Sequence, residues 1–205
     1  MIEDVAAAAR RRVSRETFDR LELYAELLRA EAQRQNLVSR STLGQLWQRH
    51  ILDSAQLVRF ELRPGVPWAD IGSGAGLPGI VVALLVEGPV TLIEPRRLRA
   101  DFLARAVDAL GLSERVRVEA AKVEQVRGSY DMLTARAVAA LDRLLDLSHH
   151  LSTRNSIWVL PKGRSAQSEL AQARRSWQCE ARSEPSYTDP QSQILVLTGV
   201  RARQR

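Results

Sequence analysis

The sequence predicts an α/β protein with a doubly wound, mostly parallel sheet and an N-terminal helical extension. Three observations predict this class. The first part of the chain follows a helical pattern only, short apolar strands alternate with helices after Pro67, and the first of these strands runs into a glycine-rich loop. Such alternation is typical of parallel β-α-β units. We therefore expect an extension over residues 1–64 and a main domain over residues 65–205.

The extension is expected to contain two helices. Within residues 2–32, apolar side chains recur at the spacing of one helix face, namely Leu21, Tyr24, Ala25 and Leu28. The run Asn36-Leu37-Val38-Ser39 interrupts this pattern. We expect Ser41 or Thr42 to cap a second helix that ends near Val58.

The main domain is expected to alternate strands and helices to its end. Short apolar runs predict six strands, at residues 68–71, 90–93, 116–119, 130–135, 157–160 and 194–197. Helical patterns predict four helices, at residues 78–86, 96–110, 141–151 and 166–175. Ser183 to Gln193 is rich in Ser, Pro and Asp and should form the loop of a hairpin. The basic end, Arg201 to Arg205, should fray.

Composition excludes several protein classes. A chain of 205 residues that is 45% hydrophobic can bury a sizeable core, so wholesale disorder is excluded. Its one cysteine, Cys179, leaves no disulfide framework or cysteine-rich zinc site, and we expect no metal and a reducing, cytoplasmic location. Because no apolar run approaches ~18 residues, no membrane span is expected.

The charge favours a polyanionic partner without establishing one. Thirty basic residues against 24 acidic residues give a net charge of +6, and such an excess is common in nucleic-acid-binding proteins. Only Lys122 and Lys162 are lysines, so 30 − 2 = 28 basic residues are arginines. We favour the codon usage of a GC-rich genome as the cause of that preference, so arginine usage alone is no evidence for RNA binding.

The segment from Asp70 to Gly79, with sequence DIGSGAGLPG, carries the most functional information. Glycines allow a sharp turn after the strand and leave space where a ligand approaches the backbone. The loop then enters a helix, whose free N–H groups favour an electron-rich group. Two cofactors fit this pattern, a dinucleotide and S-adenosylmethionine. In both interpretations Glu94, at the end of the second strand, accepts hydrogen bonds from ribose hydroxyls.

Three observations favour S-adenosylmethionine. Asp70 precedes the first glycine by two residues, which a dinucleotide motif does not require. The sheet has one nucleotide-binding half where a dinucleotide usually needs two. No later segment resembles a substrate domain for hydride transfer. A glycine turn that only packs a helix onto the sheet is the remaining alternative.

Six short elements occur in the order found in one protein family. They are Asn36-Leu37-Val38-Ser39, Arg49-His50-Ile51-Leu52-Asp53-Ser54, the glycine loop, Lys122-Val123-Glu124, Thr134-Ala135-Arg136-Ala137 and Leu160-Pro161-Lys162-Gly163. Together they resemble the RsmG/GidB family of bacterial 16S rRNA guanine-N7 methyltransferases. This resemblance implies a class I S-adenosylmethionine-dependent methyltransferase with a Rossmann-like, seven-stranded sheet. Its implied target is N7 of guanine 527 in the 530 loop.

The loop pattern and the resemblance together imply roles for individual residues. The cofactor would contact Asp70, Gly72, Gly74, Gly76, Leu77, Glu94, Val123, Glu124 and Arg136. The RNA would contact His50, Arg96, Arg97, Lys162 and Arg164. Gly72 and Leu77 would line the methionine and sugar side, and Val123 and Glu124 would flank the adenine. His50 and Asp53 would tie the N-terminal helices to the mouth of the pocket.

The sequence departs from the family pattern beside the second strand. Arg96, Arg97 and Arg99 stand near the position of a lysine pair, and Pro95 replaces a common serine. These departures concern RNA contacts more than the cofactor. Further basic candidates for RNA contact lie on the first helix, at Arg10, Arg11, Arg12 and Arg15.

Transfer of a methyl group to guanine N7 requires no general base, because the ring nitrogen attacks with a free lone pair. We therefore assign no certain catalytic residue and give Arg136, the one candidate, a binding role. The expected partner of this monomer is 16S rRNA or the small ribosomal subunit. A methyltransferase for another RNA or a small molecule, and a non-catalytic RNA-binding module, remain alternatives.

Overall fold

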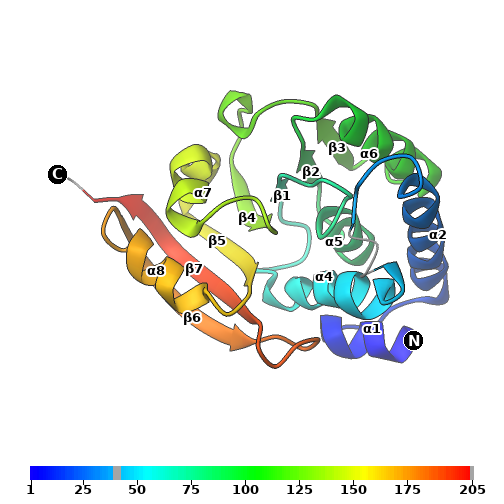
Figure 1. Ribbon diagram of the computed structural model, residues 1–205, viewed down its shortest axis with the longest axis horizontal. Coiled ribbons are helices and arrows are strands. Elements are labelled where there is room, and N and C mark those ends of the chain that lie inside the picture. Colours follow the sequence, from blue (N-terminus) through cyan, green and yellow to red (C-terminus); the bar gives the residue numbers. More distant parts are fainter. Residues whose placement is uncertain (39–42, 204–205) are drawn as a thin grey trace.

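A computed structural model describes residues 1–38 and 43–203 and contains a seven-stranded sheet with helices on both faces (Figure 1). The strand order is β3-β2-β1-β4-β5-β7-β6. The first five strands in this order are parallel, and β7 is antiparallel to both of its neighbours. The order reverses between β1 and β4, which is where doubly wound sheets bind ligands. The expected mostly parallel, doubly wound fold is thus confirmed.

The strands overlap the six predicted segments, except that β6 has no counterpart among them. Their bounds are β1 Trp68–Ile71, β2 Val90–Ile93, β3 Val116–Glu119, β4 Tyr130–Ala135, β5 Ser152–Lys162, β6 Trp177–Pro185 and β7 Gln193–Ala202. The first four match the prediction residue for residue. β5 and β7 are longer than predicted: β5 also pairs with β4 at Ser152, and β7 pairs with β6 as far as Ala202.

The expectation of a fraying end is wrong for Arg201 to Arg203. Arg201 pairs with Gln178 of β6, and the backbone N–H of Arg203 donates to the carbonyl of Ser176 at 2.8 Å. Pairing within the C-terminal hairpin therefore orders this basic segment as far as it is described.

Helices occupy the connections between consecutive strands from β1 to β6, and further helices precede β1. The α-helices are α1 Ile2–Ala9, α2 Arg15–Glu31, α4 Asp53–Ala55, α5 Gly79–Leu85, α6 Arg97–Ala109, α7 Leu141–Ser148 and α8 Ala166–Ala173. The π- and 3₁₀-helices are η1 Trp47–Leu52, η2 Gln56–Phe60, η3 Val123–Gln125 and η4 His149–Leu151.

The single helix predicted over residues 2–32 is wrong, because the chain turns between α1 and α2. Arg10 adopts a left-handed conformation with φ 51°, and the Ser14 side chain caps α2 by accepting the N–H of Thr17 at 3.0 Å. The cap predicted at Ser41 or Thr42 lies outside the described residues. From Trp47 to Phe60 the predicted helix is a succession of π-, α- and 3₁₀-helical turns.

Alternation along the strands divides the core into two hydrophobic clusters. Trp68 points into the cluster formed with α1, α2, α5 and α6, and its neighbour Ala69 points into the cluster formed with α7 and α8. Leu21 and Tyr24 of α2 belong to the same cluster as Trp68 and are fully buried. The N-terminal helices therefore share a continuous core with the sheet.

Candidate functional site

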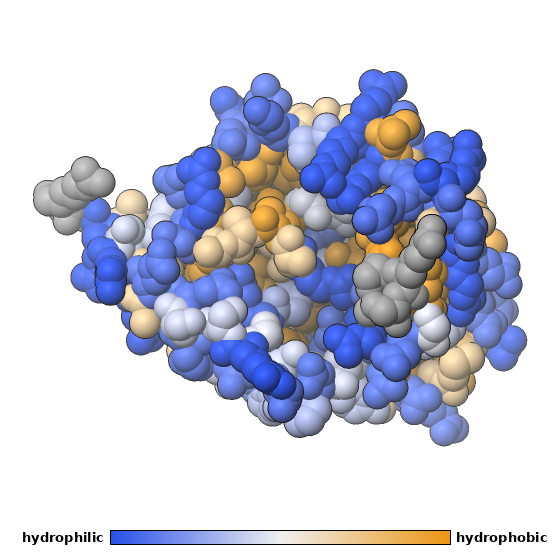
Figure 2. Space-filling view, viewed as in Figure 1, coloured by the Kyte–Doolittle hydropathy of each residue, from blue (hydrophilic) through white to orange (hydrophobic). Residues whose placement is uncertain are grey.

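Two cavities lie at the carboxyl ends of the parallel strands and share the loop that follows β4. The glycine-loop cavity, of about 400 Å³, is lined by residues that include Gly72, Glu94, Arg96, Lys122, Val123 and Glu124. The Lys162 cavity, of about 530 Å³, is lined by residues that include Asp53, Arg136, Pro161, Lys162, Glu169 and Gln193. Ala137 and Val138 line both cavities. Figure 2 shows apolar side chains near the centre of this face, over the end of β4, inside a hydrophilic rim.

The first glycine of the loop forms part of the wall of the glycine-loop cavity. Gly72 has φ +68°, a conformation that side chains disfavour. A Cβ at this position would lie 2.6 Å from Cγ2 of Val138, which covers the loop from the end of β4. Any side chain at residue 72 would therefore both strain the turn and displace Val138.

Asp70 lies behind the loop and lines neither cavity. Its side chain is 1% exposed, and its Oδ2 accepts the N–H of Gly79 at 3.0 Å. Burial raises the pKa of Asp70 to about 7, against the opposing effect of its hydrogen bonds. The group that accepts a hydrogen bond from the first turn of α5 is thus the protein's own carboxyl, which holds the loop in place.

The predicted contacts within the loop divide into two groups. Gly72 and Glu94 line the glycine-loop cavity, whereas Gly74, Gly76 and Leu77 do not. A Cβ on Gly76 would meet Ile80 and the hydroxyl of Tyr24, so this glycine faces the core. The structure brings Gly72 and Glu94 together at the cavity, and the other loop residues lie outside its lining.

Glu94 joins the loop to the second strand. Its Oε2 accepts the N–H of Gly74 at 2.9 Å and its Oε1 accepts the N–H of Arg96 at 2.8 Å. The side chain is only 3% exposed, yet it lines the cavity. Since a carboxylate has about four acceptor positions, Glu94 retains capacity for hydroxyl donors.

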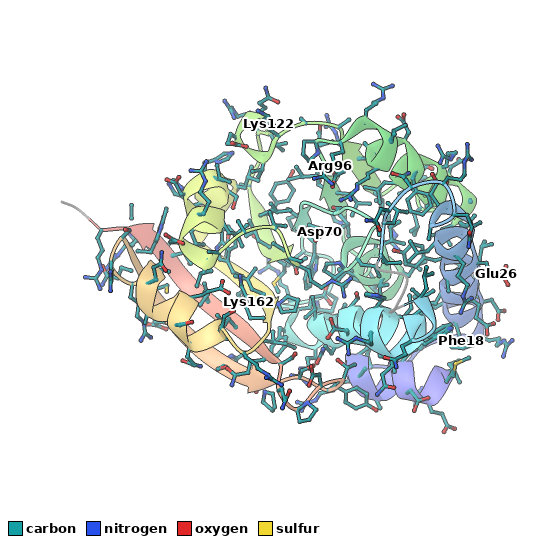
Figure 3. The ribbon with its side chains drawn as sticks, in the orientation of Figure 1. Phe18, Glu26, Asp70, Arg96, Lys122 and Lys162 are labelled. Atoms are coloured by element: carbon teal, nitrogen blue, oxygen red, sulfur yellow. The ribbon has the colours of Figure 1, made fainter. Side chains whose placement is uncertain are left out.

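The composition of the glycine-loop cavity fits S-adenosylmethionine. Apolar side chains of Ile93 and Val123 can cover the faces of an adenine, and Glu94 offers an acceptor for ribose hydroxyls. Gly72 leaves the backbone open to close approach. In Figure 3, Arg96 and Lys122 lie on one side of Asp70 and Lys162 lies on the other, so the two cavities flank the end of β1.

Arg136 lies at the end of β4 and joins it to the N-terminal helices. Its Nη1 lies 3.3 Å from Oδ2 of Asp53 and donates to the carbonyl of Arg49 at 3.4 Å, and its Nη2 lies 3.2 Å from Nδ1 of His50. Burial, with Arg136 and Arg49 nearby, lowers the pKa of His50 to about 4. His50 is therefore neutral at pH 7 and adds no charge for RNA binding.

Asp53 extends this network to the C-terminal hairpin. Its Oδ1 accepts hydrogen bonds from Gln56 and from the Thr188 hydroxyl, each at 2.9 Å. Thr188 belongs to the loop between β6 and β7. Asp53 therefore connects three segments that are far apart in the sequence, and it lines the Lys162 cavity where they meet.

Lys162 is mostly buried and paired. Its Nζ lies 2.8 Å from Oε2 of Glu169, and the two side chains are 12% and 20% exposed. Despite partial burial, hydrogen bonds from Lys162 and Ser165 lower the pKa of Glu169, which stays ionised. Sequence patterning did not single out Glu169, because it follows Lys162 by one loop and occupies an ordinary polar position of α8.

The arginines predicted to contact RNA differ in how free they are. Arg97 pairs with Asp101 at 2.9 Å on the surface, and the exposed Arg164 bonds Gln191. Arg11 points inward and donates to Glu61 and to the carbonyls of Val58 and Leu85, so its role is structural. Arg96 lines the glycine-loop cavity.

Tyr24 is a supporting residue that sequence patterning assigned to the core alone. It is fully buried on α2, and its hydroxyl donates to the carbonyl of Ala75 at 2.8 Å. The extension thus holds the glycine loop directly. A polar atom within an otherwise apolar helix face was the available signal.

Among residues 1–38 and 43–203, no cluster of His, Cys, Asp and Glu is arranged to hold a metal ion. Within the same residues, no helix is both long and apolar enough to cross a membrane.

The chain resembles one family over most of its length. Residues 17–195 match a family model described as GidB, rRNA small subunit methyltransferase G. A relative named ribosomal RNA small subunit methyltransferase G from Rhizorhabdus wittichii is 47% identical, with 94% of this chain and 90% of the relative covered. A relative of the same name from Zymomonas mobilis is 42% identical at the same coverage.

A solved structure with the same fold comes from Aquifex aeolicus. It is described as a SAM-dependent methyltransferase and superposes with a TM-score of 0.59 at 14% sequence identity. The superposition covers 74% of this chain and 90% of that one. At this identity the match speaks for the fold.

Proposed function

The chain belongs to the GidB family of rRNA small subunit methyltransferase G proteins, and on that premise we propose guanine 527 in the 530 loop of 16S rRNA as its target. The activity of the family is S-adenosylmethionine-dependent methylation of N7 of a 16S rRNA guanine. The fold that carries this activity is the class I methyltransferase fold.

The observation that carries the proposal is the pairing of two cavities at one edge of the sheet. We assign the cofactor to the glycine-loop cavity, where Gly72, Glu94, Val123 and Glu124 would hold it. The cofactor supplies an electrophilic methyl group on a sulfonium. We assign the target base to the Lys162 cavity, which shares Ala137 and Val138 with the first.

The protein's part in the reaction is placement and charge. N7 of guanine attacks with a lone pair, so no proton has to be removed before attack. Neither His50, which is neutral and bonded to Arg136, nor Asp70, which lies behind the loop, is needed as a base. Positioning alone can supply several kcal/mol, up to ~7–11 in ideal cases.

Charge in the Lys162 cavity suits a purine that becomes positive. Arg136 and Lys162 are each paired with a carboxylate, Asp53 and Glu169 respectively. The pairing keeps unbalanced positive charge away from the methylated base. We therefore propose a positioning role for Arg136 and no general acid or base.

RNA would be held by exposed arginines around the two cavities. Arg96, Arg97 and Arg164 are exposed, and the chain carries a net charge of +6. Contacts with phosphates make binding weaken steeply with salt. We propose that the enzyme acts as a cytoplasmic monomer on free 16S rRNA or on the small subunit, with residues 1–64 as an extension of the methyltransferase domain.

Methyl transfer from labelled cofactor tests the function. The substrates are naked 16S rRNA and small subunits from a strain that lacks this protein, followed by mapping of N7-methylguanine. We expect label at a single guanine in the 530 loop. Label elsewhere in the RNA, or only on a small molecule, would contradict the proposed target. Comparison of the two substrates identifies the natural one.

A further inference from the structure

Two charged side chains form one wall of the Lys162 cavity. Lys162 lies at the end of β5 and Glu169 lies in the first half of α8, with Nζ and Oε2 2.8 Å apart. Both side chains are mostly buried, and both line the cavity. Cofactor binding does not use this pair, because neither residue lines the glycine-loop cavity.

The hydrogen bonds of Glu169 leave one acceptor position open. Within the described chain, its Oε2 accepts from Lys162 at 2.8 Å and from the N–H of Leu141 at 3.1 Å, and its Oε1 accepts from Ser165 at 2.7 Å. An ionised carboxylate has about four acceptor positions. Oε1 therefore retains one acceptor position on the carboxylate that pairs with the lysine.

The hydrogen bonds of Lys162 leave one donor open. An ammonium group has three N–H donors. Among the described residues, one donates to Glu169 and another to the carbonyl of Ala139 at 3.4 Å. The Lys162 and Glu169 pair, which lines the cavity, thus retains one donor and one acceptor.

This pattern is complementary to guanine. On the ring, the O6 acceptor is next to the N1–H donor, whereas adenine places a donor at C6 next to an acceptor at N1. We propose that Lys162 and Glu169 select the target base as guanine, with Lys162 donating to O6 and Glu169 accepting N1–H. The proposal rests on the proposed function and adds the residues that read the base.

The arrangement leaves the reacting atom uncovered. Contacts at O6 and N1 do not occupy N7, which stays accessible to the methyl donor. A carboxylate at N1–H also favours the positive charge that methylation places on the purine. The Asp53 and Arg136 pair is less suited to reading the base, because it is looser, at 3.3 Å, and already holds His50, Arg49 and Thr188.

The test compares three synthetic RNAs that carry guanosine, inosine or adenosine at the target position. Inosine keeps O6 and N1–H and lacks the 2-amino group, whereas adenosine reverses both contacts. The proteins are wild type, Glu169→Gln, Lys162→Met and the control Glu31→Gln. Glu31 is a carboxylate of similar burial, paired with Arg105 at 3.0 Å away from both cavities. Single-turnover methylation is measured for each combination of protein and RNA, and cofactor affinity is measured for each protein.

In wild type we expect inosine RNA to be methylated within about threefold of guanosine RNA, because the two contacts are kept. Glu169→Gln and Lys162→Met should each slow methylation of guanosine RNA by about 10- to 100-fold. Each should also reduce the guanosine-to-adenosine ratio by about tenfold or more. The intrinsic difference in N7 reactivity cancels in that comparison. Cofactor affinity, which reports folding, should be unchanged, and Glu31→Gln should resemble wild type throughout.

Two results would overturn the proposal. If both variants slowed guanosine and adenosine RNA by the same factor, the pair would be structural only. If inosine were rejected as strongly as adenosine, the 2-amino group would be the feature that is read. If Glu169→Gln loses cofactor affinity, and so does not fold properly, the results for Lys162→Met decide whether the proposal holds. Failure of wild type to methylate guanosine RNA would instead refute the proposed function.

Discussion

The two cavities lie side by side at one edge of the sheet, yet they are built in different ways. The glycine-loop cavity is lined mainly by the segments that follow the neighbouring strands β1 to β4, with Glu94 holding the backbone of the loop. The Lys162 cavity is formed by charged pairs from distant segments, such as Asp53 with Arg136 and Lys162 with Glu169. One site thus depends on backbone shape and the other on side-chain pairing. Substitutions in one cavity should therefore change cofactor affinity, and substitutions in the other should change the interaction with RNA.

The largest effect is expected at Gly72. Gly72→Asp places a side chain at φ +68° against Val138 and a charge beside Glu94. Cofactor affinity should fall by at least about 1,000-fold, to below detection by calorimetry. RNA affinity, measured by filter binding, should stay within about threefold of wild type. The control is Gly44→Ala, since a Cβ at Gly44 meets nothing within 4 Å. Retained cofactor affinity would refute the assignment of this cavity.

The next effect compares two carboxylates, one for each cavity. Glu94→Ala removes the acceptor of two backbone N–H groups, Gly74 and Arg96, and should weaken cofactor binding by about 100-fold. Glu169→Ala should leave cofactor affinity within about twofold, because it lies in the other cavity. Equal loss in both variants would mean that the two cavities form a single coupled site.

Asp70, which lies behind the glycine loop, should make the stability of the protein depend on pH. Because burial raises its pKa to about 7, the folded state holds a proton that the unfolded chain, with a pKa near 3.8, has released. Its contribution to stability is therefore full below the unfolded pKa and is lost as pH rises through about 7. Asp70→Asn keeps an acceptor for Gly79 and removes this titration. Between pH 5 and pH 8, wild type should lose on the order of 2 kcal/mol of unfolding free energy relative to the variant.

Urea unfolding at several pH values measures this difference, in which the other titrating groups largely cancel. Parallel curves for wild type and Asp70→Asn would show that the buried carboxyl does not titrate in this range. The Lys162 cavity offers no counterpart, because hydrogen bonds from Lys162 and Ser165 keep the pKa of Glu169 low despite its partial burial.

The difference between local backbone shape and the pairing of distant side chains also explains which features the sequence could predict. Four strands, including the two that lead into the glycine loop and Glu94, were predicted to the residue, because periodicity and turn chemistry are local signals. The interruption of the helix between Arg10 and Ser14 was not predicted, because a left-handed conformation at an arginine has no sequence signature. Glu169 was also missed. Its role depends on β5, α8 and the loop after β4 meeting in space, and no local pattern encodes that meeting.

The smallest effect is expected at Tyr24, where the N-terminal extension contacts the glycine loop. Tyr24 of α2 donates to the carbonyl of Ala75, and burial raises its pKa, so the hydroxyl remains a donor. Tyr24→Phe keeps the packing and leaves that carbonyl unpaired, which should cost about 1 kcal/mol. If the loop is held partly by this bond, cofactor affinity should fall by about fivefold, while Tyr187→Phe, an exposed tyrosine, changes nothing. Loss of stability without loss of affinity would mean that the loop keeps its shape from local contacts alone, and would sharpen the contrast between the two cavities.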